Sequence, residues 1–202
     1  MDILIKSVSD CTLALIALIN PISKIFLISS LRENASGGAV RRIIVKSSFV
    51  AIIILLAFIF MGNFLLARFF HIQIYAFKMA GGIVLFMRGL DALNKGLFFE
   101  LTHKQKLEDM SIVPLASPMI AGPATITAAV SFPAHYGIPV TSVSIIIAVC
   151  INLLIMMLAP FITTHLIKQN IMGALIRITG LIVATIGIQM MLDGLHEFIK
   201  TI

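Results

Sequence analysis

The feature that most constrains the fold is a series of six long apolar stretches joined by short linkers. They cover residues 8–31, 43–66, 71–91, 111–132, 139–163 and 173–195. About 20 mostly apolar residues in a helix cross the hydrocarbon core of a bilayer. The 202-residue chain is 59% hydrophobic and 12% charged, whereas soluble domains are about 45–50% apolar and about 25% charged. The sequence therefore predicts an all-α polytopic membrane protein whose spans contact the lipid bilayer.

An internal repeat divides the chain into two halves. FKMAGGIVLF at 77–86 aligns with IRITGLIVAT at 176–185, and Gly81 then matches Gly180. We expect these small residues to be seams for close helix packing. Each half holds three spans, and because three is odd, the second half is inverted relative to the first. Inverted repeats with discontinuous helices are a recurring plan of secondary transporters.

The repeat gives a simple domain organisation. We predict a single membrane domain made of a first three-helix repeat, a cytoplasmic linker and a second, inverted three-helix repeat, which cover residues 1–95, 96–110 and 111–202. Spans one and four, the first of each repeat, are the ones that we expect to be broken near the middle of the membrane.

Basic residues indicate the orientation of the spans. They are concentrated in the loops after spans one, three and five, while the loop PAHYGIP after span four has none. Cytoplasmic loops carry an excess of Lys and Arg. We therefore predict that the N- and C-termini lie on the outer, periplasmic side. This asymmetry accounts for the net charge of +6, so the charge does not indicate a nucleic-acid partner.

No motif in the sequence indicates catalysis, a cofactor or a metal. The five His fall in five different loops or span ends, whereas zinc ligands recur at close spacing. Walker A, GxGxxG, GxSxG and HExxH motifs do not occur. Cys11 and Cys150 are isolated, which gives no support to a disulfide framework. We expect neither an enzyme nor a cofactor-binding protein.

Proline interrupts two of the spans near their middle. Span one contains Asn20-Pro21, and span four contains Gly122-Pro123. Asn is a preferred helix N-cap, and Pro is favoured at the first helical position. Gly permits the unusual backbone angles that a break needs. Each proline is therefore predicted to begin a second half-helix near the bilayer centre.

The start of a half-helix inside a membrane is suited to binding an anionic group. Its first N–H groups are unpaired, and it carries about half a positive charge, which is why helix N-termini bind anions. The carbonyl groups freed near Ile19 and Ala121 would hold an ammonium group. A small zwitterionic solute such as an amino acid matches this polarity. We predict a solute site formed by Asn20, Pro21, Ser23, Gly122, Pro123, Ala124 and Thr125.

A simpler interpretation of the two breaks also has to be considered. Pro and Gly kink membrane helices without any ligand, and neighbouring Ser or Thr side chains can satisfy the freed backbone groups. Two breaks at matching places of an inverted repeat favour a transport site instead, because paired interruptions are the best sequence indication of one.

Two charged side chains are candidates for a coupling group or for the charge of an anion site. Lys24 follows Pro21 by about one helical turn, and Asp10 precedes Asn20 by about three turns. We expect Lys24 to snorkel to the cytoplasmic interface, and reinforcement of the anion site is the alternative. Interfacial solvation is the simpler explanation of Asp10. The coupling ion stays open between a proton and sodium, and the sequence gives no oligomeric state.

The chain resembles the MarC family of bacterial and archaeal inner-membrane proteins over nearly its whole length, in the motifs LINPISKIFLI, FKMAGGIVLFMRGLDAL, VPLASPMIAGPATIT and RITGLIVATIGIQMMLDGL. The resemblance implies six spans in two inverted repeats and small neutral amino acids, such as glycine and alanine, as solutes. Its signature positions are Asn20, Pro21, Gly122 and Pro123. The sequence departs from the family pattern at Lys24 and Phe26, where members often carry a small or uncharged polar residue and a proline.

We therefore expect a secondary transporter of small neutral amino acids in the bacterial inner membrane. It would work by alternating access between the two repeats. The alternative, from a different functional class, is a non-transporting membrane scaffold or accessory protein.

Overall fold

The protein is almost entirely helical in the part of the chain that the computed structural model describes, residues 2–34, 36–95, 120–167 and 172–201. No β-strand occurs in these ranges, so the all-α prediction is confirmed for them. The elements, in chain order, are α1 (Asp2–Ile19), α2 (Pro21–Asn34), α3 (Gly37–Asn63), the π-helical η1 (Phe64–Phe69), α4 (Ile74–Lys95), α5 (Pro123–Ser131), α6 (Pro133–Tyr136), α7 (Ile138–Ile167) and α8 (Met172–Ile199).

Three of the described helices are long and apolar enough to cross a membrane, within Gly37–Gly62, Ile138–Thr163 and Gly173–Ile199. The helices α1 and α2 add a fourth candidate if the pair, bent by 43°, is one span. These four correspond to predicted spans one, two, five and six. The described helices thus support a multi-pass membrane protein with three or four spans, and the six-span inverted repeat stays a prediction.

The two remaining predicted spans are represented differently. Span three corresponds to the 22-residue helix α4, which carries several charged side chains along its length. Span four contains the short helix α5, Pro123–Ser131. The first half of span four and the predicted linker 96–110 lie outside the described residues.

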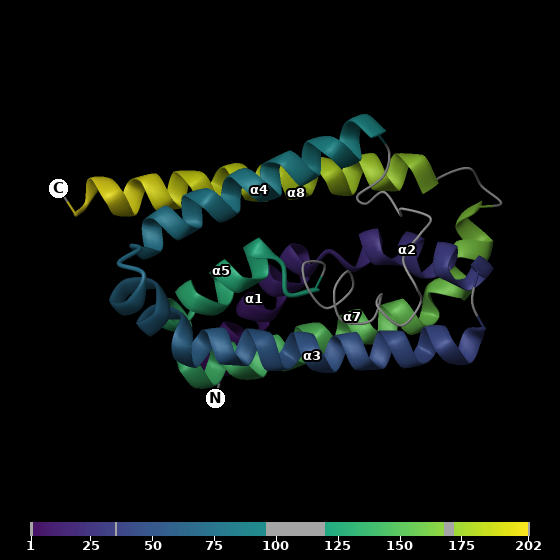
Figure 1. Ribbon diagram of the computed structural model, residues 1–202, viewed down its shortest axis with the longest axis horizontal. Helices are drawn as coiled ribbons and strands as arrows, with labels where there is room; N and C mark the ends of the chain where they lie inside the picture. Colours follow the sequence, from purple (N-terminus) through teal and green to yellow (C-terminus); the bar gives the residue numbers. More distant parts are fainter. Residues whose placement is uncertain (1, 35, 96–119, 168–171, 202) are drawn as a thin grey trace.

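The helices are arranged as one bundle with a helix pair beside it (Figure 1). In the bundle, α7 contacts α1, α2 and α3, and α5 contacts α3. Large apolar side chains fill its core, and Leu15, Leu55, Ile145 and Met156 are fully buried there. The pair consists of α4 and α8, which contact each other along their length. It approaches the bundle through contacts of α4 with α5 and of α8 with α2.

Glycine allows α4 and α8 to approach each other very closely. A Cβ atom on Gly82 would lie 2.6 Å from the carbonyl oxygen of Gly187, and one on Gly89 would lie 2.6 Å from that of Gly180. As residue numbers rise along α4 they fall along α8, so the two helices are antiparallel (Figure 1). Small residues at the interface are the usual means of close packing between membrane helices. The predicted packing seam at Gly180 is therefore confirmed, and Gly82 lies in the same seam.

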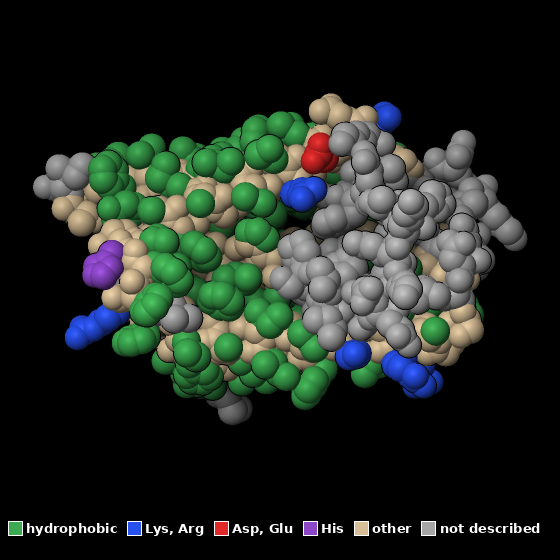
Figure 2. Space-filling model, in the orientation of Figure 1, with side chains coloured by type: hydrophobic (Ala, Val, Ile, Leu, Met, Phe, Trp, Pro, Cys, Tyr) green, Lys and Arg blue, Asp and Glu red, His purple; other side chains and the backbone are tan. Residues whose placement is uncertain are grey.

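Large apolar side chains also cover the outside of the molecule. Phe49, Phe60, Leu154 and Phe161 are all more than half exposed. Figure 2 shows hydrophobic side chains spread over α4, α8 and the bundle on the face in view. Lipid tails are as apolar as Leu, so such a surface suits a bilayer. In this protein apolar side chains are therefore found both in the core and on the outside.

Candidate functional site

The first break lies at Asn20, between α1 and α2. The backbone N–H of Asn20 donates to the carbonyl oxygen of Ile16 at 2.9 Å, which closes the last turn of α1. Asn20 has a φ of 50°, a left-handed conformation in which Asn is enriched among non-glycine residues. Pro21 then begins α2. The predicted position of the break is confirmed, but Asn20 has the backbone of a helix C-terminus and not the extended backbone of an N-cap.

The second break lies at Gly122, directly before α5. Gly122 is the N-cap with an extended backbone, φ −86° and ψ 175°, and Pro123 is the first helical residue. The N–H of Ile126 donates to the Gly122 carbonyl oxygen at 2.9 Å. The N–H groups of Ala124 and Thr125 precede that bond, so helix geometry gives them no carbonyl partner within α5. The prediction that Pro123 begins a helix is confirmed.

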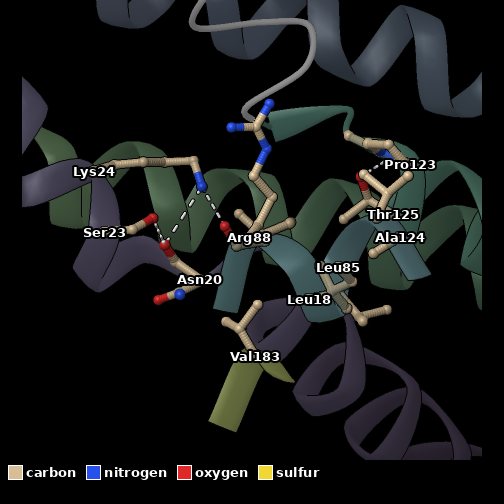
Figure 3. A pocket seen from close by; sticks show the side chains of 13 residues that line it. Leu18, Asn20, Ser23, Lys24, Leu85, Arg88, Pro123, Ala124, Thr125 and Val183 are labelled. Atoms are coloured by element: carbon tan, nitrogen blue, oxygen red, sulfur yellow. Dashed lines mark hydrogen bonds between the residues drawn. The ribbon is translucent and has the colours of Figure 1, made fainter. Parts of the chain in front are cut away.

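A cavity of about 170 Å³ lies between the two breaks. Most ligand pockets for drug-sized molecules measure about 300–1,000 Å³, so this cavity suits a small solute. Four parts of the fold form it: the α1–α2 break, the middle of α4, the start of α5 and α8 (Figure 3). Its lining residues are Leu18, Ile19, Asn20, Ser23, Lys24, Val84, Leu85, Arg88, Gly122, Pro123, Ala124, Thr125 and Val183.

The structure brings most of the predicted site residues together. Six of the seven predicted binding residues line the cavity, namely Asn20, Ser23, Gly122, Pro123, Ala124 and Thr125. The seventh, Pro21, is buried but is not among the lining residues. Asp10 is exposed on α1 and lies outside the cavity lining.

Lys24 does not snorkel to the interface, so that expectation is wrong. Its side chain is 1% exposed. Its amine donates to the carbonyl oxygen of Ile19 and lies 3.4 Å from that of Asn20 (Figure 3). The break deprives these carbonyl groups of their helical donors, and a buried polar group without a partner is costly. The amine therefore reaches back to the break, and Lys24 lines the cavity.

Hydroxyl groups satisfy other carbonyl groups at both breaks. The Ser23 hydroxyl donates to the Asn20 carbonyl oxygen at 2.8 Å. The Thr125 hydroxyl has one proton to donate and lies within bonding distance of two carbonyl oxygens, that of Ile120 at 2.8 Å and that of Gly122 at 3.0 Å. The chain's own donors thus occupy carbonyl oxygens on both sides of the cavity. The Ile19 carbonyl, predicted to hold a solute's ammonium group, already accepts a bond from Lys24.

Arg88 is a lining residue that sequence reasoning did not place in the site. It extends from α4 and lies between Lys24 and Thr125 in the close view (Figure 3). Its position near the cytoplasmic end of predicted span three placed it with the basic loop residues. The sequence feature that could have indicated its role is that Arg88 lies within the apolar stretch 71–91. Charged residues inside a span usually face a bundle interior or a cavity.

A second cavity, of about 360 Å³, lies beside the first. Leu18 lines both cavities. The second is also formed between the bundle and the α4–α8 pair, and its polar lining includes Lys78, Thr127, His135 and Asp193. The Lys78 amine forms an ion pair with Glu197 of α8. The two cavities together follow the boundary between the two groups of helices.

Known proteins resemble this chain over nearly its whole length. Residues 5–199 match the family described as MarC family integral membrane protein. A UPF0056 membrane protein of Pyrococcus horikoshii is 37% identical, with 95% of this chain and 94% of that protein covered. A UPF0056 membrane protein of Bacillus subtilis is 31% identical, with 91% of each chain covered. No solved structure matches the chain significantly. The chain belongs to the MarC family of integral membrane proteins.

Proposed function

We propose that this chain is a secondary transporter of small neutral amino acids, of the glycine and alanine class, that works by alternating access. The observation that carries the proposal is a small cavity built on two helix breaks from opposite halves of the chain. Helix starts that face a cavity from two inverted repeats are the usual form of a transporter's solute site. The solute's carboxylate would lie against the first N–H groups of α5.

The pattern of helix contacts supports two related halves. In the predicted repeat, α1 and α2 correspond to α5, α3 corresponds to α7, and α4 corresponds to α8. The contacts of α1 and α2 with α7 therefore correspond to the contact of α5 with α3. The same correspondence turns the contact of α4 with α5 into that of α8 with α1 and α2, and all of these contacts are present. The antiparallel α4–α8 pair joins the third helix of each half. Such a design lets one group of helices rock against the other around a fixed site.

The test is uptake of radiolabelled alanine and glycine by proteoliposomes that contain the purified protein. We expect wild-type vesicles to accumulate the amino acid and Gly122→Leu to abolish uptake, because the new side chain would start at the cavity lining. Gly173→Leu is the matched control, since a Cβ at Gly173 meets nothing within 4 Å. Wild-type vesicles that move no amino acid under either a proton or a sodium gradient would contradict the proposal.

One observation favours the alternative of a non-transporting membrane scaffold or accessory protein. Ser23 and Thr125 satisfy freed carbonyl groups at both breaks, as expected for kinks that need no ligand. A scaffold of this kind would tolerate Gly122→Leu, and it would co-purify with a fixed partner from the native membrane. Loss of uptake in Gly122→Leu with unchanged folding separates the two functions.

A further inference from the structure

We infer that Lys24 makes the cavity between the breaks select small carboxylate anions without an ammonium group over amino acids of the same size. This inference rests on the proposed transport function and specifies the charge of the preferred solute. It comes from three features of the cavity: its hydrogen-bond acceptors, its charges and its apolar lining.

An ammonium group binds through hydrogen-bond acceptors, which in this cavity are carbonyl oxygens at the breaks. The carbonyl oxygens of Asn20 and Ile19 accept bonds from Ser23 and Lys24. Those of Ile120 and Gly122 share the single hydroxyl proton of Thr125. Lys24 supplies one of those donors from its own amine. At the first break, the carbonyl oxygen of Ile19 therefore already accepts a bond from an amine of this protein, where a zwitterion's ammonium group would have to bind.

The charges point the same way. Lys24 and Arg88 are both basic and line the cavity, and no Asp or Glu is among the described residues that line it. The start of α5 at Pro123 adds partial positive charge, whereas at the first break the end of α1 at Ile19 offsets the start of α2 at Pro21. An ammonium group brought into this cavity would meet like charge at low dielectric, which is unfavourable. A carboxylate would meet donors on both sides.

The environment of Lys24 suits an anionic ligand. Within the described part of the chain its polar partners are two backbone carbonyl oxygens, and its side chain is 1% exposed. A negative charge beside a buried amine stabilises its ammonium form. A bound carboxylate supplies the missing negative charge, and a solute that carries its own ammonium group supplies no net charge at all.

The rest of the cavity fits a short hydrocarbon chain. Leu18, Val84, Leu85 and Val183 give it apolar walls, and Ala124 at the α5 start is small and 3% exposed. The volume of about 170 Å³ admits a solute of a few carbon atoms. Propionate and lactate have the size of alanine but carry a net negative charge, which makes them the matched probes.

The experiment compares propionate, lactate, alanine and isopropylamine with the purified full-length protein. Dissociation constants come from ligand-dependent thermal stabilisation, and transport comes from competition with labelled alanine in proteoliposomes. We expect wild-type protein to bind propionate and lactate about tenfold or more tightly than alanine, and isopropylamine least of all. The matched variant is Lys24→Gln, which keeps an N–H donor for the Ile19 carbonyl and removes the charge. It should lower the anion-to-alanine affinity ratio by about tenfold or more.

A second variant guards against loss of the fold. Lys24→Arg keeps the positive charge, and it should keep the preference for the anions even if it binds every solute more weakly. Alanine bound as tightly as propionate by wild-type protein, or an unchanged ratio in Lys24→Gln, would overturn the inference while labelled alanine uptake left the proposed transport function standing. A protein that neither binds nor transports any of these carboxylates would overturn both.

Discussion

Asn20 holds the backbone conformation on which the first break depends. Its φ of 50° is disfavoured for most L-amino acids, because their Cβ approaches the following carbonyl oxygen. Asn tolerates this region better than other side chains, and glycine enters it freely. The same residue lines the cavity and presents its carbonyl oxygen to Ser23 and Lys24. Asn20 is therefore both a strained backbone position and a lining residue of the cavity.

Two substitutions at Asn20 test the backbone conformation independently of the asparagine side chain. We expect Asn20→Gly to keep the stability of the wild type, since glycine accepts the left-handed conformation. Asn20→Val should lower the free energy of unfolding by about 1–2 kcal/mol relative to Asn20→Gly. Thermal unfolding of the two variants in the same detergent gives the comparison. Equal melting temperatures would show that residue 20 is not left-handed in the protein.

Local rules predicted the breaks, but they did not predict what the charged side chains do. Pro21 and Pro123 begin helices where the sequence places them, because the missing N–H and fixed φ of proline act within one turn. The direction of Lys24 depends instead on which carbonyl groups the break leaves unpaired, and this requires the three-dimensional path of α1 and α2. Arg88 was missed for a similar reason, since its relation to the breaks arises only from helix packing.

At the scale of elements, the α4–α8 pair is defined by glycine. A Cβ on Gly89 would lie 2.5 Å from the backbone nitrogen of Ala184, and a Cβ on Gly187 would lie 2.6 Å from that of Phe86. Real Cβ atoms essentially never approach backbone atoms that closely. Any larger residue would push the helices apart. The sequence repeat predicted packing seams at Gly81 and Gly180 without predicting which helices pair. Gly180 lies between α4 and α8, whereas Gly81 faces Thr127 of α5.

Replacing glycine by alanine should destabilise the protein at Gly89 but not at Gly38. Gly89→Ala should lower the melting temperature, because backbone atoms of α8 block the new methyl group. Gly38→Ala in α3 meets nothing within 4 Å, so it should leave stability unchanged or raise it by up to about 1 kcal/mol through helix propensity. Melting curves of both variants test this. A Gly89→Ala variant as stable as wild type would mean that α4 and α8 are not in close contact.

For the whole molecule, both cavities lie between the bundle and the α4–α8 pair. Gly81 of α4 faces Thr127 of α5, and a Cβ at Gly81 would lie 2.7 Å from the Thr127 hydroxyl oxygen. Alternating access requires this boundary to open and close. The four candidate spans follow from the apolar pattern of the sequence. The division into a bundle and an α4–α8 pair takes helices from both predicted repeats and depends on long-range contacts that the sequence did not predict.

A disulfide across this boundary should stop transport. Gly81→Cys with Thr127→Cys, in a background with Cys11→Ser and Cys150→Ser, places a sulfur close to the partner's Cβ, as disulfide geometry requires. We expect oxidation to abolish uptake by the double variant and dithiothreitol to restore it, while uptake by Thr127→Cys alone does not respond to oxidation. Full uptake by the oxidised double variant, with the cross-link verified by mass, would show that α4 and α5 do not separate during transport.

The most direct measurement for the whole account is uptake by proteoliposomes containing wild-type protein, Gly122→Leu or Gly173→Leu, with labelled alanine and labelled propionate assayed in parallel. The account predicts that wild-type and Gly173→Leu vesicles accumulate both solutes above protein-free vesicles, that propionate is preferred, and that Gly122→Leu vesicles accumulate neither. Uptake of both solutes at the protein-free level by folded wild-type protein, or equal uptake by Gly122→Leu, would contradict the claim that the two helix breaks form a transport site.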